Sequence, residues 1–224
     1  MPDLSTLDAI HSARSLRRFK PDPVPDDVMR QVLDAAIRAP SGSSSQNWIF
    51  VVVRDPQVRN GLGEIYRKAA RALTAEYSDR GLPAHLESRQ FNLMRKSSTY
   101  LFDHLADAPV ILVAALRHAS IGTRHSPLDP AAEQARAWRT SGASIYPAVQ
   151  NIILACRALS LGTVLTTIHT FYESEVKALL ELPADVHTYA LMPIGYPLDK
   201  FGPVKRRPIE EVAFLDRFGN PWHA

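Results

Sequence analysis

The stretch SIYPAVQNIILACRALSL, residues 144–161, would carry apolar side chains on nearly every side if it were wound into a helix. These side chains include Ile145, Val149, Ile152 and Leu159. A helix that is apolar all round is normally buried at the centre of a domain. The stretch therefore predicts a central buried helix, and Gly162 is well placed to end it.

Short apolar runs with the length and β-branched content of buried strands lie on both sides of this helix. The expected strands cover residues 48–53, 110–116, 163–168 and 189–194. Helical periodicity predicts further helices at 4–13, about 26–39, within 56–108 and at about 171–181. Because helices and strands are interleaved, the chain should fold as α/β or α+β around one sheet.

Local signals indicate where several of these elements begin and end. Asp26 is expected as a helix N-cap, and Pro40 should stop that helix at the residue before it. Thr170 and Glu173 have the spacing of a capping box. Residues 117–139 show no clear period, which predicts a long loop of the kind that is often functional.

Composition excludes several classes of protein. Lys and Arg total 26 against 23 Asp and Glu, a net charge of +3 with no basic stripe, which argues against a nucleic-acid-binding module. The longest apolar runs, such as 110–116, are too short to cross a bilayer, and the N-terminus lacks the pattern of a signal peptide. The single cysteine, Cys156, fits a reducing compartment. We expect a soluble, cytoplasmic protein with no membrane or nucleic-acid partner, in which Cys156 is an inert core thiol.

The common catalytic and binding motifs are missing from the sequence. Gly61 and Gly63 suggest a dinucleotide fingerprint, but Tyr66 occupies the third glycine position. The histidines and the single cysteine form no metal-binding pattern, so we expect no metal site. Neither a nucleophile elbow nor a phosphate-binding P-loop occurs.

Three polar stretches carry functional interest. Residues 13–20 combine basic side chains with Ser15, and residues 203–208 are basic again. Between Pro40 and Trp48 lie four serines, a glycine, Gln46 and Asn47. Each stretch alone fits a solvated turn, a loop or a tail. Together they favour a shared anionic ligand, because charge-assisted bonds and close backbone approach both suit one.

These stretches also resemble a known family. The matching motifs are Arg14-Ser15-Leu16-Arg17 with Phe19, residues 21–24, Ala39-Pro40-Ser41-Gly42 with Gln46 and Trp48, residues 147–151, 157–163 and 194–197, and Lys205-Arg206-Arg207-Pro208-Ile209. They occur in the order found in the FMN-dependent nitroreductase family, from residue 10 to residue 212. The sequence resembles that family over most of its length.

The resemblance implies an α+β fold: a three-layer sandwich with a central mixed or antiparallel sheet, flanking helices and a long buried central helix. It implies a single domain over 1–224, with a helical and loop insertion at about 60–140 near the substrate entrance and an extended C-terminal tail at 203–224. It also implies a homodimer with FMN at the subunit interface.

The resemblance further implies roles for individual residues. Arg14, Ser15 and Arg17 match positions that hold the FMN phosphate and the pyrimidine edge of the flavin. Pro40, Ser41 and Gly42 match a loop that the partner subunit contributes, and Ser44 and Gln46 belong to the same polar loop. Thr166 and Thr167 match a strand end that lines the flavin, and Lys205 and Arg206 match a C-terminal phosphate anchor. The chain departs from the family pattern at Ala13, Ser44 and Asn47, where arginine, asparagine and proline are usual.

The implied activity is that of an FMN-dependent NAD(P)H oxidoreductase. It would reduce nitroaromatic or quinone-type acceptors by a ping-pong mechanism, with NADH or NADPH as reductant. A reductive dehalogenase, an enoate-type reductase or a non-catalytic flavin-binding protein on the same fold are the alternatives. Because the cofactor carries the chemistry, no residue is expected as a general acid or base. Candidate substrate-stacking residues are Phe91, Tyr100, Phe102 and Trp138, for which core packing is an equal possibility.

Overall fold

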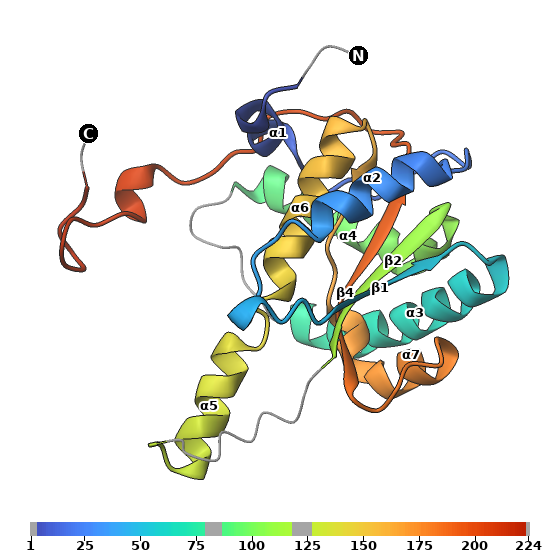
Figure 1. Cartoon of the computed structure of the whole chain (residues 1–224). Helices are drawn as coiled ribbons and strands as arrows, with labels where there is room; N and C mark the ends of the chain where they lie inside the picture. The colour runs from blue at the N-terminus through green and yellow to red at the C-terminus, as the bar shows by residue number, and fades with distance from the viewer. Residues whose placement is uncertain (1–3, 79–86, 118–126, 223–224) are drawn as a thin grey trace.

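The computed structural model describes residues 4–78, 87–117 and 127–222, without the side chains of 74–78 and 138. Its centre is a four-stranded antiparallel sheet in the order β1-β2-β4-β3 (Figure 1). The strands are β1 (Trp48–Val53), β2 (Val110–Arg117), β3 (Gly162–Thr163) and β4 (Val186–Gly195). The helices are α1 (Thr6–Ser12), α2 (Asp26–Ala36), α3 (Pro56–Ser78), α4 (Ser88–His104), α5 (Pro130–Thr140), α6 (Ile145–Ala158) and α7 (Glu173–Leu179). Short 3₁₀ turns are η1 (Gly42–Ser44), η2 (Leu105–Asp107), η3 (Ile168–Tyr172) and η4 (Ile209–Glu211).

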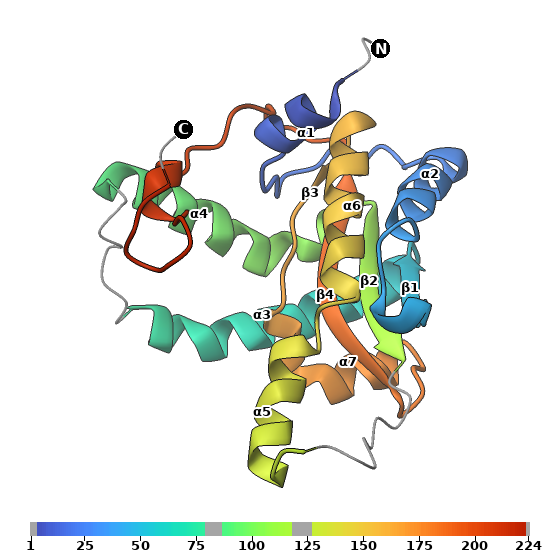
Figure 2. The same cartoon turned by 60° about the vertical axis from the view of Figure 1, so that its left-hand side comes forward.

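Strand β2 divides the core into two layers because successive side chains of a strand point to opposite faces. Leu112 and Ala114 pack with α2 and α6, whereas Ile111 and Val113 pack with α3 and α4. Helices α2 and α6 therefore cover one face of the sheet, and α3, α4 and α7 cover the other (Figures 1 and 2). This three-layer α+β arrangement confirms the expected fold class, with an antiparallel sheet.

Helix α6 is the central buried helix that the apolar stretch predicts. Ile145, Ala148, Val149 and Ile152 are all at most 1% exposed. Cys156 is also fully buried, and this burial raises the pKa of its thiol to about 12, so the group stays protonated and inert. The helix ends four residues before Gly162, through a left-handed residue at Ser160, so the prediction that Gly162 ends it was wrong.

The predicted strand at 163–168 is largely replaced by irregular backbone. Only Gly162 and Thr163 pair continuously with β4, and the chain touches β4 once more where Thr166 pairs with Leu191. Strand β1 has the predicted bounds, and β2 and β4 extend beyond theirs. Beside Leu16, Gly162 has a packing role, since a Cβ there would lie 2.9 Å from Pro197 Cβ and 3.1 Å from Leu16 Cβ.

Residues 117–139 are not a continuous loop, because α5 occupies their second half. Asp129 caps this helix by accepting a hydrogen bond from Ala132 N, and Pro130 follows at a favoured helix position. Figures 1 and 2 both show α5 projecting from the body, beyond the end of α6. No helix or strand of the described residues packs closely against α5, so it needs no strong apolar stripe, which explains why periodicity missed it.

Two predicted caps were also wrong. Pro25, not Asp26, precedes α2, and the Asp26 carboxylate pairs with Arg54 at 2.9 Å. Thr170 lies inside η3 and donates to Thr167 O, while the carboxylate of Glu173 accepts from Thr188. No helix in the described parts of the chain is both long and apolar enough to cross a membrane.

Candidate functional site

The N-terminal basic segment lies along the sheet edge near the C-terminal end of α6. Leu16 anchors it, because its N–H donates to Thr163 O at 3.0 Å and its side chain is 2% exposed. Arg14 and Ser15 are exposed, whereas Arg17 turns inward and is half-buried. The segment therefore presents Arg14 and Arg17 around one buried leucine.

Arg17 is a charged group surrounded by neutral partners. Its Nη1 donates to Ser97 Oγ of α4 at 3.1 Å, and no carboxylate of the described residues pairs with it. Burial lowers the pKa of Arg17, the nearby Tyr66 phenol raises it, and Arg14 lowers it. Because a guanidinium stays protonated in proteins, the position holds a partly desolvated positive charge that suits an anionic ligand.

A buried hydroxyl pair lies near Arg17, at the irregular strand end. Tyr66 of α3 and Thr166 share a hydrogen bond of 2.9 Å between their hydroxyl oxygens. The Thr166 backbone exchanges two hydrogen bonds with Leu191 of β4, which fixes its position at the sheet edge. Thr167 follows at the start of η3 and is half-buried. The side chains of Ser97, Tyr66 and Thr166 thus form a polar wall next to Arg17.

The C-terminal basic segment reaches the same end of the molecule. Val204 N donates to His11 O of α1 at 3.3 Å, which brings Lys205 and Arg206 beside the segment that contains Arg14. Both basic side chains are exposed, and Arg206 Nη1 bonds to the carbonyl of Lys205. Two clusters separated by almost the whole sequence therefore meet at α1.

The hydroxyl loop, residues 40–47, lies at the opposite end of α6. Gly42 N donates to Ser144 Oγ at 3.0 Å, and Trp48 Nε1 donates to Ser144 O at 2.7 Å. Inside the loop, Gln46 N donates to Ser41 Oγ at 3.0 Å. Pro40, Ser44 and Gln46 are exposed, and Ser43, Ser44 and Gln46 adopt positive φ, which is uncommon for residues other than glycine. Side-chain hydrogen bonds thus hold a strained loop open to its surroundings.

The predicted site residues therefore fall into two groups in one chain. Arg14, Ser15, Arg17, Lys205 and Arg206 lie near the C-terminal end of α6, whose Arg157 contacts Ser12. The hydroxyl loop lies at the N-terminal end of the same helix, beside Ser144 (Figure 1). Since α6 has 14 residues, the two groups are roughly 21 Å apart along its axis. One protomer does not bring them together around a single small ligand.

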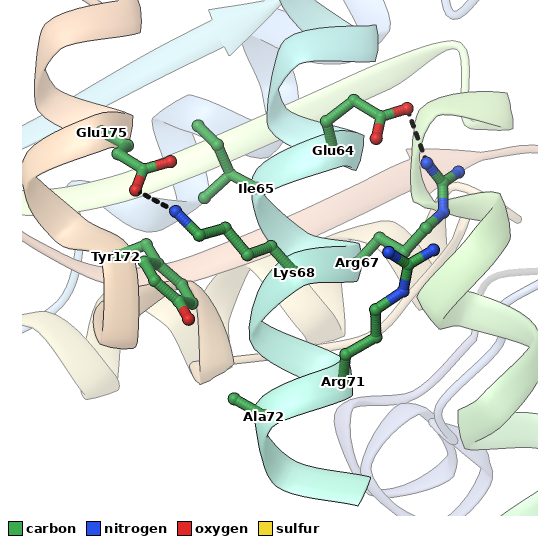
Figure 3. A pocket seen from close by; sticks show the side chains of 8 residues that line it. All are labelled: Glu64, Ile65, Arg67, Lys68, Arg71, Ala72, Tyr172 and Glu175. Carbon is green, nitrogen blue, oxygen red and sulfur yellow. Dashed lines mark hydrogen bonds and ion pairs between the residues drawn. The ribbon is translucent and has the colours of Figure 1, made fainter.

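A groove on the outer face of α3 is separate from both groups. Its volume is about 660 Å³, and it is lined by Glu64, Ile65, Arg67, Lys68, Arg71, Ala72, Tyr172 and Glu175. Figure 3 shows Lys68 directed at Glu175, 2.5 Å away, and Arg67 directed at Glu64, 2.6 Å away. No predicted site residue lines the groove, and surface ion pairs of this kind contribute little to stability. The groove therefore adds nothing to the candidate site.

Three residues that sequence reasoning did not assign to the site support it. Tyr66 has helical core spacing, which hides its bond to Thr166, and Ser97 and Ser144 carry no sequence signal for their contacts with Arg17 and Gly42. Among the candidate stacking residues, Phe102 packs on Tyr66 in the core, with ring centroids 6.1 Å apart. Tyr100 stacks on His104 and Phe91 lies near Arg95, while the Trp138 side chain lies outside the described part of the structure.

Known proteins resemble this chain over most of its length. The model of the family described as "Nitroreductase family" matches residues 10–196. The chain is 32% identical to an NADH dehydrogenase of Thermus thermophilus, covering 95% of this chain and 96% of that protein. It is 27% identical to an iodotyrosine deiodinase of Thermotoga neapolitana, covering 92% and 94%.

A solved structure of oxidised iodotyrosine deiodinase bound to FMN and 3-iodo-L-tyrosine has a similar fold. Its TM-score is 0.68 at 23% identity, with 95% of this chain and 99% of that chain covered. At this level of identity the likeness shows the fold alone. The family match, by contrast, covers well over half of the sequence, and the chain belongs to the nitroreductase family.

Proposed function

We propose that this protein is an FMN-dependent NAD(P)H oxidoreductase that works as a homodimer and reduces nitroaromatic or quinone-type acceptors. The observation that carries the proposal is the setting of Arg17. Its charge is half-buried, and its described partners are hydroxyl groups rather than carboxylates. A partly desolvated cation is stabilised by an anionic or electron-rich partner, which the pyrimidine edge of a flavin supplies.

The residues around Arg17 fit the other parts of FMN. The phosphate would be bound by Arg14, Ser15, Lys205 and Arg206. All four side chains are exposed, and they belong to the two basic segments that come together at α1. Thr166 and Thr167 would line the ring from the sheet edge. When bound, FMN supplies the two-electron chemistry that takes a hydride from a nicotinamide and passes it to an acceptor.

The residues of this chain would then position and polarise the cofactor. Arg17 would hold a fixed positive charge against the ring, which favours negative charge on the pyrimidine edge. Ser97 would orient the guanidinium, because the 3.1 Å hydrogen bond fixes one of its nitrogens. Tyr66 would fix the hydroxyl of Thr166 in one orientation through their 2.9 Å bond.

The second half of the site would come from a second copy of the chain. Pro40, Ser41, Gly42, Ser44 and Gln46 lie a helix length from Arg17 in one protomer. A two-fold dimer can place the hydroxyl loop of one protomer against the basic end of the other. The loop hydroxyls and the Gln46 amide would then bond to polar atoms of FMN that lose water in the interface.

An anaerobic titration of the purified, FMN-loaded protein tests this function. We expect NADH or NADPH to bleach the visible flavin absorbance, and a nitroaromatic or quinone added afterwards to restore it. Initial rates should give the parallel double-reciprocal lines of a ping-pong mechanism. Flavin that binds but is never reduced by a nicotinamide would instead favour a non-catalytic binding protein, and a chain that takes up no FMN would refute the proposal.

Reductive dehalogenation is the second candidate, because the sequence resembles a deiodinase over 92% of its length. The two activities would share the cofactor site and differ in the acceptor. Anaerobic release of iodide from a halogenated phenol by the reduced protein, with no turnover of nitroaromatics, would favour this second function.

A further inference from the structure

Arg157, in the last turn of α6, joins the two basic segments of the chain. Its Nε donates to Ser12 Oγ at the end of α1, at 2.8 Å. The centre of its guanidinium lies 4.3 Å from the ring centroid of Phe201, within the range of a cation–π contact. One side chain thus contacts a residue two positions before Arg14 and a residue four positions before Lys205.

The tail is held to the body at only a few points near this contact. Leu198 N donates to Arg18 O at 3.0 Å, and Asp199 pairs with the Arg18 side chain at 2.5 Å. Val204 then bonds to His11 as described above. Beyond Val204, the hydrogen bonds of the described tail residues join the tail only to itself. The Arg157–Phe201 contact is therefore the side-chain anchor nearest to Lys205 and Arg206.

We infer that Arg157 is a positioning residue for the phosphate end of the site: by holding Ser12 and Phe201 together, it sets Lys205 and Arg206 beside Arg14. This inference rests on the proposed FMN function. Arg157 acts through these neighbours, because its Nε is engaged by Ser12 and the face of its guanidinium is covered by Phe201. The alternative is that Arg157 only stabilises the C-terminal end of α6, where a basic residue is generally favourable. In that case its replacement would have no specific effect on binding of the FMN phosphate.

Comparing FMN with riboflavin separates these roles, since riboflavin lacks the phosphate. The test measures the dissociation constants of both ligands for the wild-type dimer and for the Phe201→Leu and Arg157→Gln variants. We expect FMN binding to weaken about three- to tenfold in each variant, while riboflavin binding changes by less than about twofold. Lys68→Gln is the charge-matched control, because Lys68 pairs with Glu175 and lies over the Tyr172 ring in the groove on α3, which no predicted site residue lines.

Each result distinguishes the inference from the function on which it rests. A loss of FMN selectivity in Phe201→Leu supports the inference even if Arg157→Gln fails to fold. Equal weakening of FMN and riboflavin, or unchanged affinity for both, would overturn the role of Arg157 while leaving the proposed function standing. A wild-type protein that binds neither ligand would overturn both.

Discussion

Arg17 shows how the candidate site depends on single side chains. The residues on either side of it differ sharply in exposure: Leu16 is buried and Arg18 is exposed and paired with Asp199. Residues two apart on extended backbone share a face, so the sequence alone indicates neither this difference nor which arginine turns inward. The half-buried position lowers the local dielectric around Arg17, so its charge acts more strongly than it would in water.

Arg17→Ala should weaken FMN binding about ten- to a hundredfold, since hydrogen bonds to a charged group are each worth about 1.5–3 kcal/mol. The midpoint potential of the bound flavin should also fall by about 30 mV or more, because the reduced form loses its stabilising charge. Equilibrium binding and spectroelectrochemistry measure the two effects. Arg17→Lys keeps the charge, so its midpoint potential should stay closer to the wild-type value than its FMN affinity does. Wild-type affinity and potential in Arg17→Ala would contradict the assignment.

At the scale of elements, the hydroxyl loop is supported from within its own protomer and open on its other side. A Cβ added at Gly42 would meet only Ser144 Oγ, at the ordinary contact distance of 3.7 Å. The protomer therefore has room for a side chain at this position, and the Gly42 N–H could still bond to Ser144. A glycine is needed there only if something outside the protomer approaches closely.

Gly42→Val should consequently leave the free energy of unfolding within about 0.5 kcal/mol of the wild type, as is usual for exposed substitutions. The same change should weaken FMN binding at least about tenfold, because the added branches would occupy the space of the ligand. Denaturant unfolding of the apoprotein and FMN titration check the two parts. The FMN affinity of Gly42→Ala should lie between those of the wild type and Gly42→Val. Full FMN affinity in Gly42→Val would exclude the loop from the site.

The packing of η3 and α7 against β4 places a histidine in the core. His169 is 0% exposed, and its Nε2 lies 3.2 Å from Thr188 Oγ1. Because Thr188 donates its own hydroxyl proton to Glu173, His169 must donate from Nε2 and keep Nδ1 unprotonated. Nδ1 has no partner among the described residues, and burial lowers the pKa of His169 to about 4 despite the opposing effect of Glu173.

This pKa predicts acid sensitivity in a defined window. The unfolded chain takes up a proton at His169 near pH 6.5, whereas the folded chain takes it up only near pH 4, so stability falls as the pH decreases between these values. The loss should reach up to about 3 kcal/mol. Urea unfolding from pH 7.5 to pH 4 measures it. His169→Gln, whose amide can still donate to Thr188, should show a shallower decline; identical curves would contradict the assignment.

The elements that sequence reasoning predicts best are those whose own residues decide the outcome. The apolar runs of β1 and β2 and the all-round apolar surface of α6 confirm this, since burial on both faces leaves a clear pattern. Predictions failed where a distant partner decided: Glu173 bonds to Thr188 of β4 instead of capping its helix. Likewise, the supporting bond from Tyr66 to Thr166 joins residues 100 positions apart and leaves no local signal.

At the scale of the whole molecule, the two groups of predicted site residues lie at opposite ends of α6, as the proposed two-chain site requires. The tail adds to this picture, because apolar side chains such as Phe218, 92% exposed, and Leu215 lie on a segment extended from the body (Figure 1). Exposed apolar surface of this kind is typical of contact with another chain. Both features favour the proposed homodimer.

Mixing two defective subunits tests the shared site directly. A heterodimer of an Arg17→Ala protomer and a Gly42→Val protomer should contain one site with both changes and one site with neither. We expect such heterodimers, purified through two different affinity tags, to bind FMN tightly at one of their two sites. Each homodimeric variant should bind it weakly at both. A heterodimer no better than its parents would show that the two groups do not share a site.

The separation of the two residue groups along α6 also limits how two copies of the chain could be arranged. If each site combines the C-terminal end of one α6 with the N-terminal end of the other, the two α6 helices must run antiparallel on either side of the two-fold axis. In that arrangement the axis would pass near the middle of the helix, where the exposed side chain of Gln150 would lie close to its own counterpart. A substitution at that point would change the same contact from both sides, and its effect would reach both proposed sites together.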